Sequence, residues 1–336
     1  MPAPKGARVV AEVTSMVDGP IGEPPRTSRR HELLSVLVLA LVLVAVAVVV
    51  SRNWQAFVDS IDRIGIGGVA LSLAAAVVGV VGNYLQWRSV LVGLEVRFGA
   101  LEGARVFFVS QLGKYLPGSV WPIVLQMEAG RRRGAGRKTM LAANLITVLL
   151  SLCVGLVLAA LLLPFSSPSA LHKFWWALAA LPLLVVLAHP RSFPFLLDRV
   201  LKVLRREPLQ VRMTGPATMT ALGWSALSWA AFGAHLAVLA AAVGEPSLGL
   251  LALCIGGMGL AVSAGLLFLP APAGAGMREV VLGAVLLTVL TSGQVVAVVV
   301  ASRVIILLAD LLLAGLVSLT GGQSRSRHGQ HGRGVA

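Results

Sequence analysis

Residues 295–319 read VVAVVVASRVIILLADLLLAGLVSL, a run of 25 residues in which Arg303 and Asp310 are the only charged side chains. A helix of about 20 apolar residues crosses the hydrocarbon core of a bilayer, so this run predicts a membrane-spanning helix. Hydrophobic types make up 57% of the 336 residues and charged types 12%, about half the share found in soluble domains. The composition therefore excludes a soluble globular protein and predicts an all-α, polytopic membrane protein.

Further apolar segments bring the expected number of spans to about eight, although the last of them is too short to cross alone. They are residues 33–50, 65–87, 140–163, 174–188, 214–243, 247–269 and 280–290. Gly215, Gly223 and Gly233 within 214–243 predict close helix packing. We expect disordered cytoplasmic tails over 1–32 and 320–336, on either side of a membrane domain over 33–319.

The net charge of +14 has mostly a topological origin. Segments that we place in the cytoplasm hold 22 of the 28 Lys and Arg residues, and segments placed outside hold three. By the positive-inside rule, this predicts a multi-pass plasma-membrane protein with both termini in the cytoplasm. The charged cytoplasmic rim in this interpretation consists of Arg88, Glu95, Glu102 and Arg105. The basic run 131–138 suits anionic lipid headgroups and not nucleic acid.

Segment 192–206 has an apolar stripe with a basic back, which predicts a helix lying on the inner leaflet. A short helix packed on the protein itself is the alternative. Glu128 either closes the neighbouring hairpin against Arg131–Arg133 or is an ordinary solvated charge.

The stretch 106–128 is apolar but lies between two basic loops that both favour the cytoplasm. Pro117-Gly118 divides it into arms of about ten residues, each roughly 15 Å of helix and so half a bilayer. We interpret it as a re-entrant hairpin. Its candidate headgroup-binding residues combine a cation, a helix start and amphipathic rings: Lys114, Tyr115, Pro117, Gly118, Ser119 and Trp121. A kinked helix whose Lys114 reaches the surface is the alternative.

A second interrupted element covers 270–290, and whether 248–290 forms a re-entrant pair or two spans stays open. Gly274 and Gly276 allow close backbone approach before Arg278 and Glu279 open a short helix. Arg278 could hold a phosphate while Glu279 pairs with it or carries a proton; alternatively both lie at a cytoplasmic surface.

Arg303 and Asp310 lie two turns apart on one helix face, too far for a direct bridge. Because ionisable groups inside a membrane need partners, we expect each to meet a charge on another helix, such as Glu279 or Lys114.

The chain resembles the flippase-like family named for the transmembrane region of lysylphosphatidylglycerol synthase. The resemblance rests on Asn83–Arg88 (NYLQWR), Gly113–Trp121 (GKYLPGSVW), Gly274–Glu279 (GAGMRE) and Arg303, and covers about residues 33–319. Pro272-Ala273-Gly274 departs from the Pro-Gly-Gly usual there. In the full-length synthases a soluble aminoacyl-transfer domain follows this region, whose membrane part is taken to move the lipid. The sequence ends 17 residues after Leu319, so we expect a stand-alone member.

The resemblance and the buried cations together imply a lipid translocase that binds an anionic headgroup, either of a phospholipid or of a polyprenyl-phosphate-linked lipid. The alternative is a non-catalytic membrane subunit or scaffold for a separate lipid synthase or glycosyltransferase. We expect no enzymatic activity, no cofactor and no metal site. Cys153 and Cys254 lie in apolar runs and are interpreted as small buried hydrophobic residues.

Overall fold

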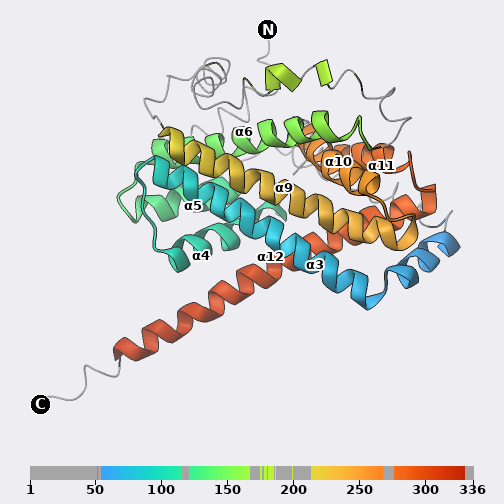
Figure 1. Cartoon of the computed structure of the whole chain (residues 1–336). Coiled ribbons are helices and arrows are strands. Elements are labelled where there is room, and N and C mark those ends of the chain that lie inside the picture. The colour runs from blue at the N-terminus through green and yellow to red at the C-terminus, as the bar shows by residue number, and fades with distance from the viewer. Residues whose placement is uncertain are drawn as a thin grey trace, which may run out of the picture.

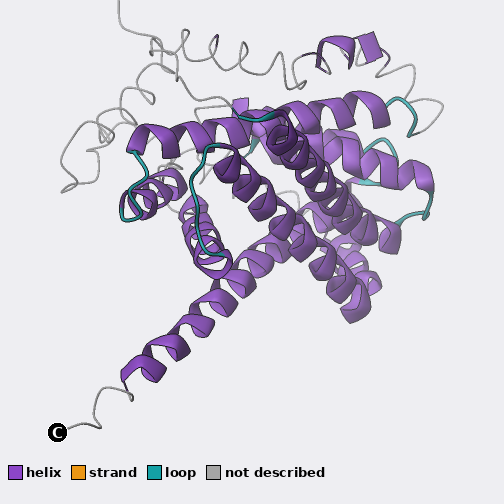
Figure 2. Cartoon of the chain, turned by 60° about the vertical axis from the view of Figure 1, so that its left-hand side comes forward, coloured by secondary structure: helices purple, strands orange, loops and turns teal. Residues whose placement is uncertain are grey.

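The computed structural model describes residues 54–115, 121–166, 213–267 and 276–329, together with Ser51 and a few positions between 175 and 199. Every regular element in this part of the chain is a helix (Figure 2). Five of the helices are long and apolar enough to cross a membrane, which confirms the fold class. The count of eight spans is not confirmed, because segment 33–50 and about half of segment 174–188 lie outside the described residues. Nearly all of the predicted interfacial helix 192–206 lies outside them as well.

The five long helices contain the strongest predicted spans. They are α3 (Trp54–Gly93), α6 (Arg137–Leu162), α9 (Gly215–Val243), α10 (Leu248–Leu267) and α12 (Ser292–Gly329). Helix α3 starts eleven residues before the predicted span and bends where that span begins, at Gly65, whose φ of 55° is readily available only to glycine.

Small residues bring the helices close together, as is typical of membrane proteins. Helices α3 and α9 lie side by side (Figure 1): a Cβ added at Gly79 would meet the Phe232 ring at 2.8 Å. The prediction of close packing along α9 is confirmed only at Gly233, which abuts Ile255. It is wrong for Gly215 and Gly223, since a Cβ at either would meet nothing within 4 Å; both positions lie on faces without a described neighbour.

Two of the basic segments, 88–105 and 126–138, lie at one end of the bundle, together with the start of α9. Gly93 at the end of α3 packs against Met213 before α9, and Arg133 forms an ion pair with Glu102. We call this the basic end. At the opposite end, the Gln294 side chain donates to the Val243 carbonyl at 2.6 Å. These two basic loops therefore lie at the same end of the bundle, and the side of the membrane that this end faces stays a prediction.

Helix α12 is longer than the predicted span 295–319 and extends away from the bundle to Gly329 (Figure 1). The helix bounds run to Gly329, and the expectation of a disordered tail from residue 320 stays a prediction. A helix that is already nucleated adds one hydrogen bond for each residue it fixes, so it can continue beyond its packed portion.

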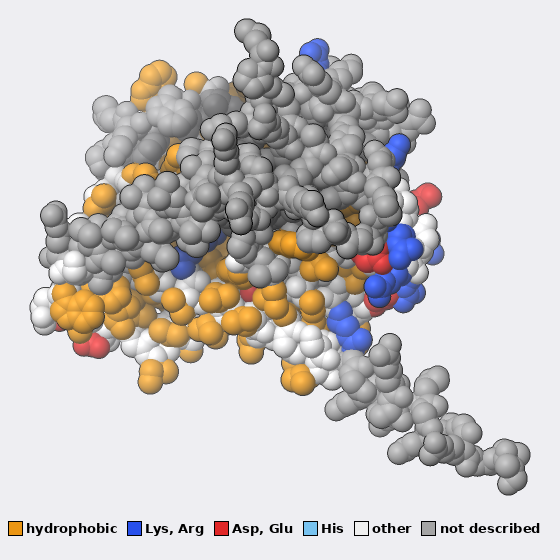
Figure 3. All heavy atoms as spheres, turned by 180° about the vertical axis from the view of Figure 1, so that it is seen from behind, with side chains coloured by type: hydrophobic (Ala, Val, Ile, Leu, Met, Phe, Trp, Pro, Cys, Tyr) orange, Lys and Arg blue, Asp and Glu red, His pale blue; other side chains and the backbone are white. Residues whose placement is uncertain are grey.

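The surface separates by polarity. In Figure 3, most of the described charged side chains in view gather at one edge, while hydrophobic side chains dominate the remaining described surface. Large apolar residues stay exposed along the long helices, for example Leu71 at 60% and Leu312 at 55%. Such exposure is unfavourable in water and favourable against lipid tails.

Candidate functional site

The segment between α3 and α6 forms a hairpin of short helices. Helix α4 (Ala100–Gln111) runs into a 3₁₀ turn, η1 (Leu112–Tyr115), and α5 (Trp121–Arg131) follows. The Glu102–Arg133 ion pair joins the outer ends of the two arms. Between the arms, the Gln126 amide donates to Ser110 Oγ at 2.8 Å. The first arm, α4, thus starts at the basic end and the second arm, α5, ends there. This is the geometry that a re-entrant hairpin requires.

The inner tip of this hairpin carries Lys114 and Tyr115. Lys114 Nζ lies 2.6 Å from Asp310 Oδ2, and the Tyr115 hydroxyl donates to the same oxygen at 2.6 Å. Trp121 opens α5 and packs against Gly113, where an added Cβ would lie 2.8 Å from the Trp121 Cβ. The predicted residues Pro117, Gly118 and Ser119 lie outside the described part of the chain.

The second interrupted element ends in the short helix α11 (Met277–Leu286). Gly276 precedes it with φ 88°, a left-handed conformation that favours glycine. The Gly276 N–H donates to Glu279 Oε2 at 2.7 Å, so the Glu279 side chain caps the start of its own helix. Gly274 lies outside the described residues. Helix α10 is a full-length span, whereas the ten residues of α11 are too few to cross.

Glu279 also forms an ion pair with Arg303 through its other oxygen, Oε1. The expectation that Arg303 and Asp310 each meet a charge on another element is confirmed by this pair and by the Lys114–Asp310 pair. The suggestion that Glu279 pairs with Arg278 is wrong, because adjacent helical residues point in different directions.

Arg278 is the cation left over. Within the described residues it has no hydrogen bond or ion pair, although it lies near enough to act electrostatically on Lys114, Tyr115 and Asp310. Asp310 Oδ1 is likewise buried and has no hydrogen-bond partner in that part of the chain. Three cations and two carboxylates meet here, so the described cluster carries a net charge of 3 − 2 = +1. We call these five ionisable residues together with Tyr115 the central cluster.

The central cluster lies deep in the bundle. Gln294 of α12 marks the opposite end through its bond to Val243, and Arg303 follows nine residues later, or about 14 Å along a helix. Arg105 of α4 donates from Nε to the Val317 carbonyl at 2.9 Å near the basic end. Arg303 is thus about halfway along the portion of α12 that would cross a core of about 30 Å.

One side of the cluster is open and the other is closed. The side chains of Lys114 and Arg303 are 32% and 37% exposed, whereas that of Asp310 is 1% exposed. Lys114 and Arg303 are therefore accessible from outside the described bundle, whereas the Asp310 carboxylate is not. An anion approaching from the open side would meet positive charge first.

His235 is a polar residue of the bundle interior that the sequence reasoning did not select. It is fully buried on α9, with Ser72 Oγ of α3 at 2.6 Å from its Nδ1 and Ser302 Oγ of α12 at 2.8 Å from its Nε2. The Ser72 hydroxyl can also donate to the His235 carbonyl, at 3.0 Å. When it does, it accepts from Nδ1–H, and Nε2 of a neutral ring accepts from Ser302. A histidine in the middle of a predicted span was the signal that could have identified it.

Helix α5 ends in exposed charges. Hydrogen bonds from Arg131, assisted by Arg132, lower the pKa of Glu128 to about 2. Of the two interpretations of Glu128, the contact with basic residues is the observed one, but these residues belong to its own helix end. Glu102 closes the hairpin instead, through Arg133.

The family model described as the lysylphosphatidylglycerol synthase TM region matches residues 34–314 of the chain. The matched stretch includes every residue of the central cluster. A search of the curated proteins finds no match.

Proposed function

Since the chain belongs to the family of the lysylphosphatidylglycerol synthase transmembrane region, we propose that it binds the anionic headgroup of a membrane lipid at the central cluster and helps that lipid to change leaflets. The ligand class includes phospholipids and polyprenyl-phosphate-linked lipids. The proposal assigns the chain no chemical step, and places it in the plasma membrane with both termini in the cytoplasm.

The observation that carries the proposal is the unbalanced charge of the central cluster. Glu279 neutralises Arg303, and Asp310 neutralises Lys114, which leaves Arg278 uncompensated among the described residues. An isolated charge inside a membrane is costly, and a phosphodiester carries one negative charge. Binding of one such headgroup would bring the cluster to neutrality.

The secondary structure around the cluster also suits a headgroup site. The tip of the α4–α5 hairpin and the start of α11 both lie within the bundle. Interrupted helices of this kind form binding sites in many transporters. The N-terminal end of α11 adds the positive end of a helix dipole beside Arg278. Irregular backbone at this depth is stable only where protein or a wet cavity covers it.

A flipping assay in proteoliposomes tests the proposal. Fluorescent phosphatidylglycerol in the outer leaflet would be bleached by dithionite, and the protected fraction would fall as the protein moves lipid. We expect a Lys114→Ala/Arg278→Ala variant to lose most of the rate, and Arg63→Gln, an exposed change on α3 far from the cluster, to retain it. An unchanged rate in the double variant would refute the assignment of these residues.

Mass spectrometry of lipids that co-purify with the protein would identify the headgroup. The proposal requires an anionic lipid to be enriched over its share of the host membrane in the wild type, and this enrichment to fall in the double variant.

A further inference from the structure

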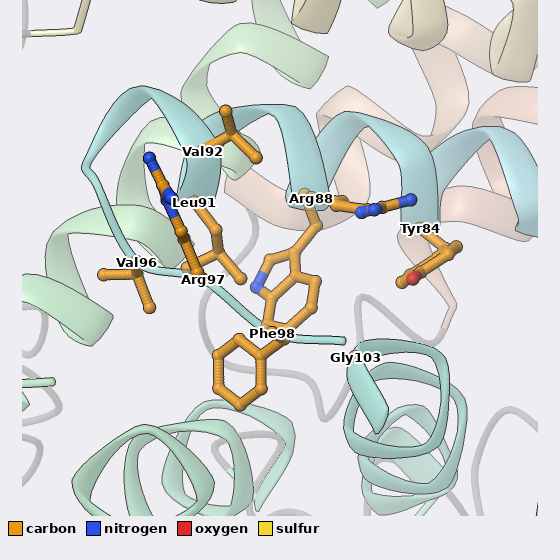
Figure 4. A pocket seen from close by; sticks show the side chains of 9 residues that line it. Tyr84, Arg88, Leu91, Val92, Val96, Arg97, Phe98 and Gly103 are labelled. Carbon is orange, nitrogen blue, oxygen red and sulfur yellow. The ribbon is translucent and has the colours of Figure 1, made fainter. Parts of the chain in front are cut away.

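A pocket of about 310 Å³ lies at the basic end, where α3 turns into α4. Its lining residues come from the last turns of α3, from the loop that follows and from the first turn of α4: Tyr84, Trp87, Arg88, Leu91, Val92, Val96, Arg97, Phe98 and Gly103. Figure 4 shows Arg88 and Tyr84 on the helix, and Arg97 and Phe98 on the loop. None of these residues belongs to the central cluster.

The loop that forms one wall is held in a defined conformation. The Val96 N–H donates to the Leu91 carbonyl at 2.9 Å, and the Glu95 N–H donates to the Val92 carbonyl at 3.1 Å. These two bonds form a Schellman motif, in which the residue after the helix cap is left-handed and usually glycine. Here that residue is Glu95, with φ 61°. Arg97 and Phe98 follow this motif directly, on the loop that lines the pocket.

Packed aromatic rings make the pocket rigid. The Trp87 ring lies 6.0 Å from Phe98 and 5.5 Å from Phe107, centroid to centroid. The Tyr84 hydroxyl donates to the Ala100 carbonyl at 2.8 Å and so attaches the start of α4 to α3. Rings fixed in this way offer a preformed apolar surface to a ligand.

The polar groups of the pocket have unused hydrogen-bonding capacity. Arg88 and Arg97 are exposed, and neither has a hydrogen bond or ion pair among the described residues. Trp87 is 1% exposed, and its indole N–H has no hydrogen-bond partner in the same part of the chain. The indole N–H is out of reach of a ligand in this structure, so the accessible hydrogen-bonding capacity of the pocket is that of the two arginines.

We propose that this pocket is a second anion site, which binds the phosphate ester of an amphiphile such as a glycerophospholipid headgroup. Arg88 and Arg97 would hold the phosphate, because guanidinium groups bind phosphate oxygens by paired hydrogen bonds. The Trp87 and Phe98 rings would contact the glycerol and the first acyl carbons. This assignment is independent of whether the chain moves lipids.

The chemistry of the pocket favours a lipid over a free phosphate ion. A phosphate ion would use the two arginines but would leave the aromatic surface without a contact. The volume is at the lower limit of small-ligand sites, which fits a headgroup but not whole acyl chains. Val92 at the rim is 60% exposed, so the pocket is continuous with apolar surface on which the chains could lie.

Native mass spectrometry of the full chain in a non-ionic detergent tests the proposal. The protein would be titrated separately with dihexanoyl phosphatidylglycerol, dihexanoyl phosphatidylcholine and inorganic phosphate. The test variant is Arg88→Gln/Arg97→Gln. The matched control is Arg63→Glu, which lowers the net charge by the same two units at an exposed position outside the pocket and outside the basic run 131–138.

We expect phosphatidylglycerol to bind the wild type and the control, and the test variant to bind one headgroup fewer, with an affinity at that site reduced by about tenfold or more. Equal loss in test and control variants, or no loss in either, would overturn the proposal. Displacement by inorganic phosphate at similar concentration would assign the pocket to the free ion. Because the assay counts bound headgroups, it distinguishes loss of binding at the central cluster from loss of binding at this pocket.

Discussion

The Lys114–Asp310 pair allows the sharpest test of the central cluster. Asp310 Oδ2 lies 2.6 Å from Lys114 Nζ and accepts a hydrogen bond from the Tyr115 hydroxyl. Replacing Asp310 by Asn removes the negative charge of this carboxylate. Lys114 is then left without a counter-charge and within the field of Arg278 and Arg303. We therefore expect the free energy of unfolding to fall.

The size of the effect follows from burial. Removing one partner of a buried ion pair costs about 3–5 kcal/mol. Asp310 is buried, but the Lys114 side chain is 32% exposed, so the lower end of this range, about 3 kcal/mol, applies here. That is on the order of a hundredfold change in the unfolding equilibrium.

Replacing both partners should behave differently. A Lys114→Met/Asp310→Leu variant contains neither charge, and well-packed apolar pairs often match a buried ion pair in stability. Tyr115 loses its acceptor, but its side chain is 46% exposed and can find another partner. We expect this variant to unfold within about 1 kcal/mol of the wild type and to lose lipid flipping.

Unfolding in mixed micelles of increasing dodecyl sulfate, followed by tryptophan fluorescence, measures both variants. Glu128→Gln serves as the control, because exposed pairs contribute at most about 1 kcal/mol. The reasoning is refuted if Asp310→Asn is as stable as the wild type, or if the double variant is as unstable as the single one. A double variant that is stable and still flips lipid would refute the functional role alone.

Four further changes are expected to have measurable effects. Gly276→Ala places a side chain at φ 88° and should cost about 1–2 kcal/mol in the same unfolding assay; an unchanged midpoint would contradict the left-handed start of α11. Glu95→Gly relieves a left-handed residue at φ 61° and should stabilise the protein by about 1 kcal/mol, seen as a higher melting temperature. His235→Ala removes two serine contacts and leaves a cavity, so a loss of about 3 kcal/mol is expected; a loss below 1 kcal/mol would argue against a structural network. Because hydrogen bonds from Arg131 lower the pKa of Glu128 to about 2, their stabilisation is complete above about pH 4.5 and is lost as the pH falls toward 2. Wild type and Glu128→Gln should accordingly show parallel melting temperatures between pH 5 and pH 8.

Much of the central cluster could be predicted because buried charge obeys a simple requirement. Arg303 and Asp310 lie inside an apolar run, so each needs an opposite charge, and few other ionisable residues lie at that depth. Glu279 and Lys114 were therefore the natural partners, and the structure contains both pairs. Which of Arg278 and Arg303 would pair with Glu279 depended on how α11 and α12 are rotated, which hydropathy does not record.

Other features were missed for the same reason. His235 meets Ser72 and Ser302 across three helices, and no local pattern shows that these residues face one another. The pocket beside Trp87 combines residues of α3, a loop and α4. From the sequence, Arg88 was interpreted as part of a charged rim and Arg97 was not singled out, because their surroundings are aromatic only after the chain folds.

The sequence by itself determined the membrane class, the strongest spans and the segments that carry topological charge, because transfer of a helix into lipid depends on a sum over consecutive residues. The tertiary structure decided which cation stays unpaired, which glycines pack and where pockets form. These depend on the faces that helices present to one another, and a rotation of one helix by about 100° exchanges one residue for the next without changing its hydropathy.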